Sequence, residues 1–213
     1  MRTFTTSTRS KLVLGLATAA IVLPLAACSS NGDGEVVAKV DTLTGQSTSV
    51  ALDKGFVDAL TSLKLTPGVV GDATLADGAV SFPITGGNVT YYKPGSTDPY
   101  VQGVIDHDGS GLSLTAGDTE VDLTNFVIDP GTSELHGDVS VNGKPAATDA
   151  LLFNLDGSTL EPLATGPNNT AILAGTTVTL SDDAAALLGD TFKTDAVKGG
   201  LVIGISTITI NAS

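Results

Sequence analysis

Apolar and polar residues alternate along most of the chain beyond residue 78, which is the pattern of β-strands with one buried face. In segment 135–141, for example, Leu135, Val139 and Val141 fall on one face. This segment runs into Asn142-Gly143, a dipeptide that favours a two-residue hairpin turn. On this basis strands are expected at 36–40, 79–85, 89–93, 100–105, 112–114, 121–128, 135–141, 151–155, 171–180 and 201–210.

Glycine, aspartate and short polar residues predict where these strands end or bend. Gly86-Gly87 is expected to turn the chain between two strands, and Asp106-His107-Asp108-Gly109 is expected to end the strand before it. Gly175 lies inside a long apolar run and indicates a β-bulge. The polar residues 45–49 are expected to form a break.

Two short segments depart from the strand pattern. Apolar residues at positions 52, 56, 59, 60 and 63 recur at helical spacing, which predicts a helix from about Leu52 to Lys64. A second helix is expected from Ala184 to Leu188. Ser181 is a suitable N-cap for the second helix, and Gly189 is expected to end it.

The order of these elements predicts an all-β domain of roughly eight to ten strands with two short helices. Sequence spacing leaves a β-sandwich and a barrel open. No repeat of fixed period is found in the sequence, which disfavours a solenoid or a propeller. We expect three parts: residues 1–27, residues 28–45 as a tether with a possible first strand, and one β domain at 46–213.

The first 27 residues have the layout of a secretory signal peptide. A basic end with Arg2, Arg9 and Lys11 precedes an apolar stretch at 12–23 and small residues before Cys28. The apolar stretch is shorter than the ~20 apolar residues that a membrane span needs. Leu25-Ala26-Ala27-Cys28 resembles the lipobox of bacterial lipoproteins, which predicts cleavage before Cys28 and a stable diacyl anchor on its thiol. An ordinary cleaved signal or a retained membrane helix is the alternative.

Cysteine content and charge exclude several classes of function. Cys28 is the only cysteine, so an intramolecular disulfide, a thiol nucleophile and a cysteine zinc site are excluded. Three of the 10 basic residues and none of the 23 acidic ones lie in the signal, which leaves 7 basic against 23 acidic and a formal charge of −16. Nucleic-acid binding is not expected, because phosphate contacts need Lys and Arg. The acidity fits a soluble, monomeric surface domain.

The two histidines each have two interpretations. His107 lies between Asp106 and Asp108, whose carboxylates would raise its pKa, and as a metal or haem ligand it would stand at the mouth of a loop. The alternative for His107 is a solvated histidine in a turn. His136 lies opposite the apolar face of its strand and is expected to be exposed.

Catalytic and metal-binding motifs find little support in the sequence. Residues 106–111 match only the first half of an EF-hand calcium loop, since position twelve is Gly117 and strands are expected on both sides. There is no Gly-x-Ser-x-Gly motif, and no pair of carboxylates stands out. Neither enzyme activity nor a bound metal is therefore expected.

The three tyrosines, Tyr91, Tyr92 and Tyr100, lie shortly before His107 in the sequence. A tyrosinate can bind ferric haem iron, and aromatic rings stack on sugars or porphyrins. Packing between strands at a sheet edge is the alternative. We therefore take these tyrosines and His107 as the candidate ligand-binding residues.

Several segments together resemble the HtaA-type haem-binding region of actinobacterial surface proteins. Residues 52–60 are similar to the amphipathic opening of that family, and 78–83 to the part that follows. Residues 103–114 are similar to its central strand, histidine turn and alternating leucines, and 177–186 to its threonine-rich strand and alanine helix. The resemblance covers about 51–210. It implies an all-β haem-binding module, held by its lipid on the outward face of the cell membrane.

The resemblance also implies where haem would bind. In the family a tyrosine of the opening segment holds haem, with the central histidine and a C-terminal tyrosine nearby. His107 matches the histidine, but Leu60 and approximately Phe192 stand at the positions of the two tyrosines. Neither side chain can ligate iron, so haem would need one of the three tyrosines named above as a replacement.

Two functions therefore remain after the sequence has been considered. A binding module for haem or another small hydrophobic ligand predicts an apolar pocket beside His107. A structural or protein-interaction module of the cell envelope predicts a filled core, an exposed His107 and no cavity near the tyrosines.

Overall fold

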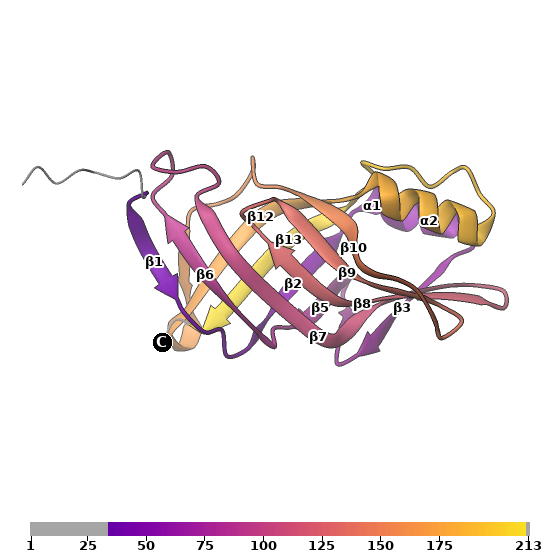
Figure 1. Cartoon of the computed structure of the whole chain (residues 1–213), viewed down its shortest axis with the longest axis horizontal. Coiled ribbons are helices and arrows are strands. Elements are labelled where there is room, and N and C mark those ends of the chain that lie inside the picture. Colours follow the sequence, from indigo (N-terminus) through magenta and orange to yellow (C-terminus); the bar gives the residue numbers. More distant parts are fainter. Residues whose placement is uncertain (1–33, 212–213) are drawn as a thin grey trace, which may run out of the picture. The chain divides into compact units, whose positions relative to one another are not determined.

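The computed structural model describes residues 34–211, so Cys28 and the expected signal peptide lie outside the described residues. The chain divides into two units, residues 1–31 and 32–213, and the fold below is that of the second unit. Within residues 34–211, thirteen antiparallel strands form one sheet (Figure 1). The strands are β1 (Val36–Val40), β2 (Gln46–Leu52), β3 (Thr66–Gly71), β4 (Thr74–Ala76), β5 (Ala79–Pro83), β6 (Gly86–Tyr92), β7 (Val101–Ala116), β8 (Thr119–Asp129), β9 (Glu134–Val141), β10 (Lys144–Asp156), β11 (Ala164–Gly166), β12 (Thr170–Leu180) and β13 (Val202–Asn211). The helices are α1 (Lys54–Leu63), α2 (Asp182–Phe192) and a 3₁₀ turn, η1 (Pro167–Asn169).

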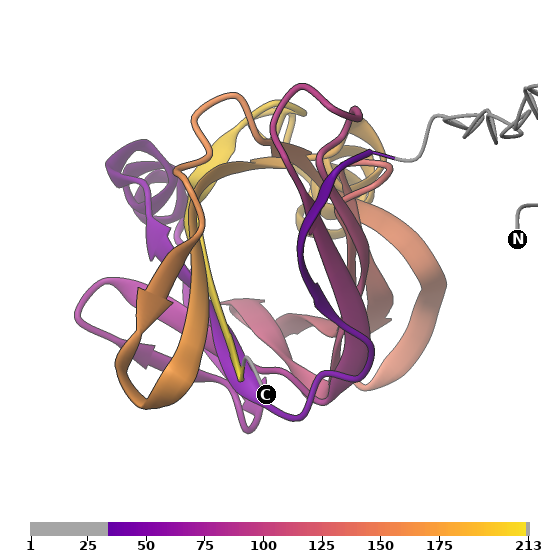
Figure 2. The same ribbon diagram turned by 90° about the vertical axis from the view of Figure 1, so that its left-hand side faces the viewer.

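The sheet has the strand order β1-β6-β7-β8-β9-β10-β12-β13-β2-β5-β4, with β3 added to β7 and β11 to β12. It curls around a common interior, which Figure 2 shows end-on. The all-β class with two helices is confirmed, although the strands outnumber those expected. In the described residues, no helix is long and apolar enough to cross a membrane.

Two local expectations about the strands are wrong. The polar segment expected to be a break at 45–49 forms most of β2, in which Thr48 and Val50 point inward and are buried. Threonine on the inner face hides the alternation that marks a strand. Gly86 and Gly87 belong to β6 and do not pair β5 with β6, because β5 pairs with β2 and β4 instead.

The strand expected to end at Asp106-His107-Asp108-Gly109 continues through these residues, because they form a bulge inside the 16-residue strand β7. The register with β8 shifts between His107 and Gly111. Gly109 has φ +71°, a conformation that glycine adopts without steric cost, and its N–H donates to the Asn125 side chain at 2.9 Å. The neighbouring strand therefore satisfies the polar groups that would otherwise form a turn.

The helix predictions are right in position and partly wrong in length. Both helices have polar N-caps: Ser181 accepts from Ala184 N–H, as expected, and Asp53 accepts from Gly55 N–H, so that the first helix begins after Asp53 rather than at Leu52. The second helix does not end at Gly189 but runs to Phe192 and is capped by Lys193 in a left-handed conformation. The Lys193 N–H donates to the Gly189 carbonyl, so Gly189 lies in the last turn rather than beyond it.

The expected hairpin and bulge are both present. Lys144 pairs with Val141 across Asn142-Gly143, whose φ values of 50° and 71° are those of a type I′ turn. The register between β12 and β13 shifts at Gly175, as expected for a bulge. These local signals depend on backbone conformation alone, which is why short segments of sequence are enough to predict them.

Candidate functional site

A cavity of about 620 Å³ lies inside the curled sheet. Side chains of β1, β2, β5 to β10, β12 and β13 line it, and most of them are aliphatic or aromatic. Residues from three connections also line it: 98–100, 130–133 and 157–163. We call the end of the cavity formed by these connections its mouth. The volume lies within the ~300–1,000 Å³ typical of small-molecule sites.

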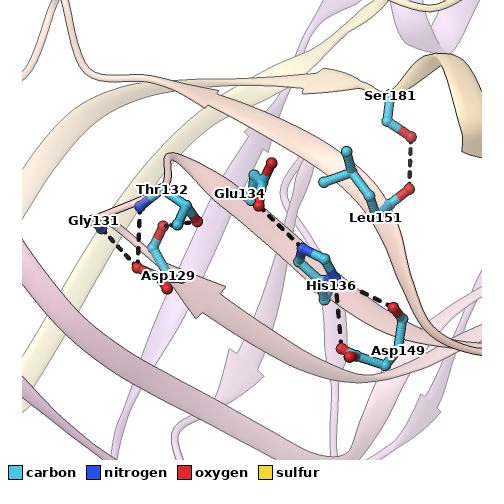
Figure 3. Close-up of polar contacts among 8 residues, drawn as sticks. All are labelled: Asp129, Gly131, Thr132, Glu134, His136, Asp149, Leu151 and Ser181. Atoms are coloured by element: carbon cyan, nitrogen blue, oxygen red, sulfur yellow. Dashed lines mark hydrogen bonds and ion pairs between the residues drawn. The ribbon is translucent and has the colours of Figure 1, made fainter.

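One connection at the mouth is held by a single carboxylate. Asp129 accepts hydrogen bonds from the backbone N–H groups of Gly131, at 2.8 Å, and Thr132, at 3.2 Å (Figure 3). This Asx turn fixes the segment between β8 and β9. Pro130 and Ser133 within it line the cavity, so the turn shapes the mouth.

His107 projects from β7 into the cavity and is only 1% exposed, which contradicts both the expectation of a histidine at a loop and that of a solvated turn. Strand alternation explains the burial, since Asp106 and Asp108 on either side of His107 point outward. The ring Nδ1 lies 3.1 Å from the Phe126 carbonyl oxygen, and Nε2 lies 2.8 Å from the Thr48 hydroxyl. A carbonyl only accepts, so Nδ1 carries the proton and Nε2 accepts from Thr48 in the neutral ring.

Burial governs the protonation of His107. Desolvation lowers its pKa to about 4, against the opposing effects of the Phe126 hydrogen bond and the Asp108 charge. The flanking carboxylates were expected to raise this pKa, and that expectation is wrong because the Asp108 effect is smaller than desolvation. At neutral pH the cavity therefore contains an uncharged imidazole.

Tyr91 and Tyr100 both line the cavity near its mouth, and Tyr92 is not among the lining residues. The rings of Tyr91 and Tyr100 meet edge-to-face, with centroids 5.6 Å apart and planes at 85°. Burial, then the nearby Tyr91, raises the pKa of Tyr100, so its phenol stays protonated at neutral pH. The packing interpretation thus describes this pair, which also forms part of the cavity wall.

The tyrosines and His107 lie far apart along the cavity. Tyr91 pairs with Val101, six residues before His107 on the same strand β7. At 3.3 Å per residue this places them about 20 Å apart. Two side chains cannot bind the same iron across that distance, so Tyr91 and His107 do not form a pair of ligands to one iron atom.

The positions of the family's tyrosines lie elsewhere. Leu60 on α1 is buried and lines a second, smaller pocket of about 50 Å³, into which Leu188 of α2 also points. Phe192 is half-buried at the end of α2 and packs against the core. Neither residue lines the larger cavity, so neither side chain faces His107 across it.

Sequence reasoning missed three polar residues of the cavity wall: Thr48, Thr176 and Ser206. Ser206 pairs with Val50 on one side and Thr176 on the other, and Thr48 lies one inward position along β2. A signal for Ser206 exists in the sequence, because it takes the inward position in a strand where Ile208 and Ile210 follow at the same spacing. Thr48 lacks such a signal, since serines surround it.

His136 belongs to the outer face of the sheet, as expected, but it is partly covered, with 30% of its side chain exposed. Nε2 lies 3.3 Å from Glu134, and Nδ1 lies 3.3 Å from the Asp149 carbonyl oxygen (Figure 3). Burial lowers the pKa of His136, but hydrogen bonds and the charges of Asp149 and Glu134 outweigh it, so the pKa is raised. Among residues 34–211, no group of three or more His, Cys, Asp or Glu could hold a metal ion.

Comparison with solved structures identifies the fold. The C-terminal domain of HtaA from Corynebacterium glutamicum superposes with a TM-score of 0.54 at 15% identity, covering 79% of this chain and 97% of that domain. This chain has the HtaA fold. The N-terminal domain of HtaA (TM-score 0.49, 13% identity, 80% and 98% covered) and the haem-binding protein HtaB (0.44, 14%, 81% and 95%) of the same organism are also similar. No protein-family model and no curated protein matches the sequence.

Proposed function

We propose that this chain is a lipoprotein on the outward face of the cell membrane whose β domain is a non-catalytic binding module for a small hydrophobic ligand. Cys28 would carry the lipid, and residues 29–34 would tether the domain. The ligand would occupy the cavity inside the curled sheet. The membrane would be its partner through the anchor, with the domain itself a monomer.

One observation carries this proposal: His107 lies inside a mainly apolar cavity of about 620 Å³. A structural module of the envelope predicts a filled core and an exposed His107. Protein interiors are packed at about 0.75 of their volume, with few voids larger than a water molecule. A void of this size is costly unless it serves a ligand.

Haem is one candidate ligand, because the HtaA resemblance implies it. Within the cavity, the Nε2 atom of His107 is the group best suited to bind its iron, once the Thr48 hydroxyl turns away. The Nδ1–H bond to the Phe126 carbonyl would then orient the ring, as is usual for histidine ligands. The wall offers no second strong ligand opposite this atom, since the tyrosines are about 20 Å away. Haem would therefore depend on His107 alone.

A titration of ferric haem into the purified chain, followed by absorption, tests haem as the ligand. His107→Ala removes the single proposed ligand, and His136→Ala is the matched control, because it removes the histidine of the outer face. We expect a saturable Soret shift in the wild type and in His136→Ala that is lost in His107→Ala. A shift that His107→Ala retains, or no shift in any of the three, would contradict haem ligation by His107.

A further inference from the structure

One part of the cavity wall carries a row of uncharged hydrogen-bonding groups. Thr176, Ser206 and Thr48 lie on the adjacent strands β12, β13 and β2, and all three line the cavity. Thr176 and Ser206 are directly paired, which places their Cβ atoms about 5 Å apart. Thr48 is diagonal to Ser206 and is joined to His107 by its hydrogen bond. We call Thr176, Ser206, Thr48 and His107 the polar row.

Ser206 and Thr176 are the members of the polar row whose hydroxyls face the open space of the cavity. Neither hydroxyl forms a hydrogen bond within residues 34–211, and no fully buried side-chain nitrogen or oxygen of these residues lacks a partner. Thr48 and His107, by contrast, are hydrogen-bonded to each other. A hydroxyl that faces an apolar cavity without a protein partner is free to bond a ligand. A ligand oxygen at this position would accept from Ser206 or Thr176.

The few charged residues of the cavity lining indicate whether the ligand oxygen at Ser206 is charged or uncharged. Lys39 and Asp98 are the charged residues of the lining, and both belong to segments near the mouth. Lys39 also forms a salt bridge with Asp41 and is 56% exposed. The imidazole of His107 is uncharged at neutral pH. An anionic group at Ser206 would therefore be buried without a countercharge, which is strongly unfavourable.

The length and lining of the cavity indicate the structure of the ligand beyond its polar oxygen. From the level of Tyr91 to that of His107 it extends about 20 Å along β7. Between these levels the wall consists mainly of aliphatic side chains such as Val89, Val101 and Ile105. An apolar chain would bury most of its surface against this wall.

We propose that the cavity binds a single-chain lipid with an uncharged, oxygen-containing head group. Ser206 and Thr176 hydrogen-bond the head group, and the acyl chain extends along the apolar wall towards Tyr91 and Tyr100. This inference rests on the proposed function and names the ligand class for the same cavity. It also distinguishes this ligand from haem, which carries two charged propionates.

The test is a competition assay on the full-length chain. The uncharged dye N-phenyl-1-naphthylamine, which fluoresces in apolar surroundings, reports occupancy of the cavity. Monooleoylglycerol and oleate at pH 8, each below its aggregation concentration, compete with the dye. They share an acyl chain and differ in the charge of the head group. We expect monooleoylglycerol to displace the dye and oleate to bind at least about tenfold more weakly.

Two variants test the role of the polar row. Ser206→Ala and Thr176→Val should each weaken monooleoylglycerol binding about two- to tenfold, the effect of losing one neutral hydrogen bond. Thr177→Val is the matched control, because Thr177 pairs with the exposed Ile205 on the outer face of the same strands. The Thr177→Val variant should bind monooleoylglycerol with the affinity of the wild type.

The outcomes separate this inference from the proposed function. If the dye binds but oleate displaces it as well as monooleoylglycerol does, the uncharged head group is wrong and the binding module stands. The inference also fails if Ser206→Ala and Thr176→Val bind like Thr177→Val. If the dye itself does not bind to the wild type, the proposed function and this inference are both wrong.

Discussion

Acidification should destabilise this domain through His107, because the folded state resists protonating that ring. Burial lowers the pKa of His107 to about 4 in the folded chain, from 6.5 for an exposed histidine. The unfolded chain therefore binds this proton first as the pH falls. The contribution of neutral His107 to the free energy of unfolding is fully present above pH 6.5. It decreases as the pH falls below that value and is lost below about pH 4.

The magnitude follows from the two pKa values. Each unit of difference corresponds to about 1.4 kcal/mol, so the full effect is roughly 3 kcal/mol, of which about 2 kcal/mol is already lost at pH 5. This is a large fraction of the ~5–15 kcal/mol by which a domain of this size is stable. Measurement at pH 5 also keeps the chain above its isoelectric point of about 4.2.

The perturbation is His107→Gln, which does not titrate but can still donate to the Phe126 carbonyl and accept from Thr48. Urea unfolding of wild type and variant at pH 7.5 and pH 5, followed by circular dichroism, gives the two losses of stability. All other titrating groups are common to both proteins, so their contributions cancel. The wild type should lose about 2 kcal/mol more than the variant. Equal losses would refute the burial of a neutral His107.

Three further predictions concern other parts of the chain. Ser181→Ala should lower the free energy of unfolding by about 1–3 kcal/mol in urea titrations, whereas Ser181→Thr should retain most of that stability. The reason is that the buried Ser181 hydroxyl accepts from Ala184 N–H and donates to the Leu151 carbonyl, a bond that Figure 3 shows. His136 has a raised pKa, so its contribution to the free energy of unfolding is present below about pH 6.5 and is lost as the pH rises through its pKa in the folded chain. His136→Gln should flatten this dependence of stability on pH. An unchanged profile of stability against pH would contradict the Glu134 and Asp149 contacts. Cys28→Ser should release the expressed chain from the membrane fraction, and retention there would contradict lipidation.

Local signals were sufficient to predict much of the fold. The hairpin at Asn142-Gly143, the bulge at Gly175 and the cap at Ser181 each depend on a few neighbouring residues. Segment 106–109 carries the same kind of local signal but forms a bulge instead of a turn. Its polar groups have partners elsewhere in the chain, namely Asn125 on β8 and Thr85 in the connection between β5 and β6, and no local sequence pattern predicts such partners.

The candidate site was predictable in its central residue and not in its surroundings. The resemblance singled out His107, and His107 does lie in the cavity. Its burial depends on Thr48, which is 59 residues away in the sequence and lies in a segment that looks like a polar break. The cavity itself arises where inward side chains of distant strands fail to meet across the interior. Such a void has no counterpart in the hydrophobic pattern of a single strand.

The central claim is that the cavity is a ligand site, and filling it tests that claim most directly. Leu173 lines the cavity, and Leu173→Trp would place a bulky ring in the void. Ile205→Trp is the matched control, since Ile205 is exposed on the outer face of the neighbouring strand. The measurement is saturable binding of N-phenyl-1-naphthylamine by fluorescence. We predict binding to the wild type and to Ile205→Trp, and loss of binding in Leu173→Trp; equal binding to all three, or none to the wild type, would contradict the account.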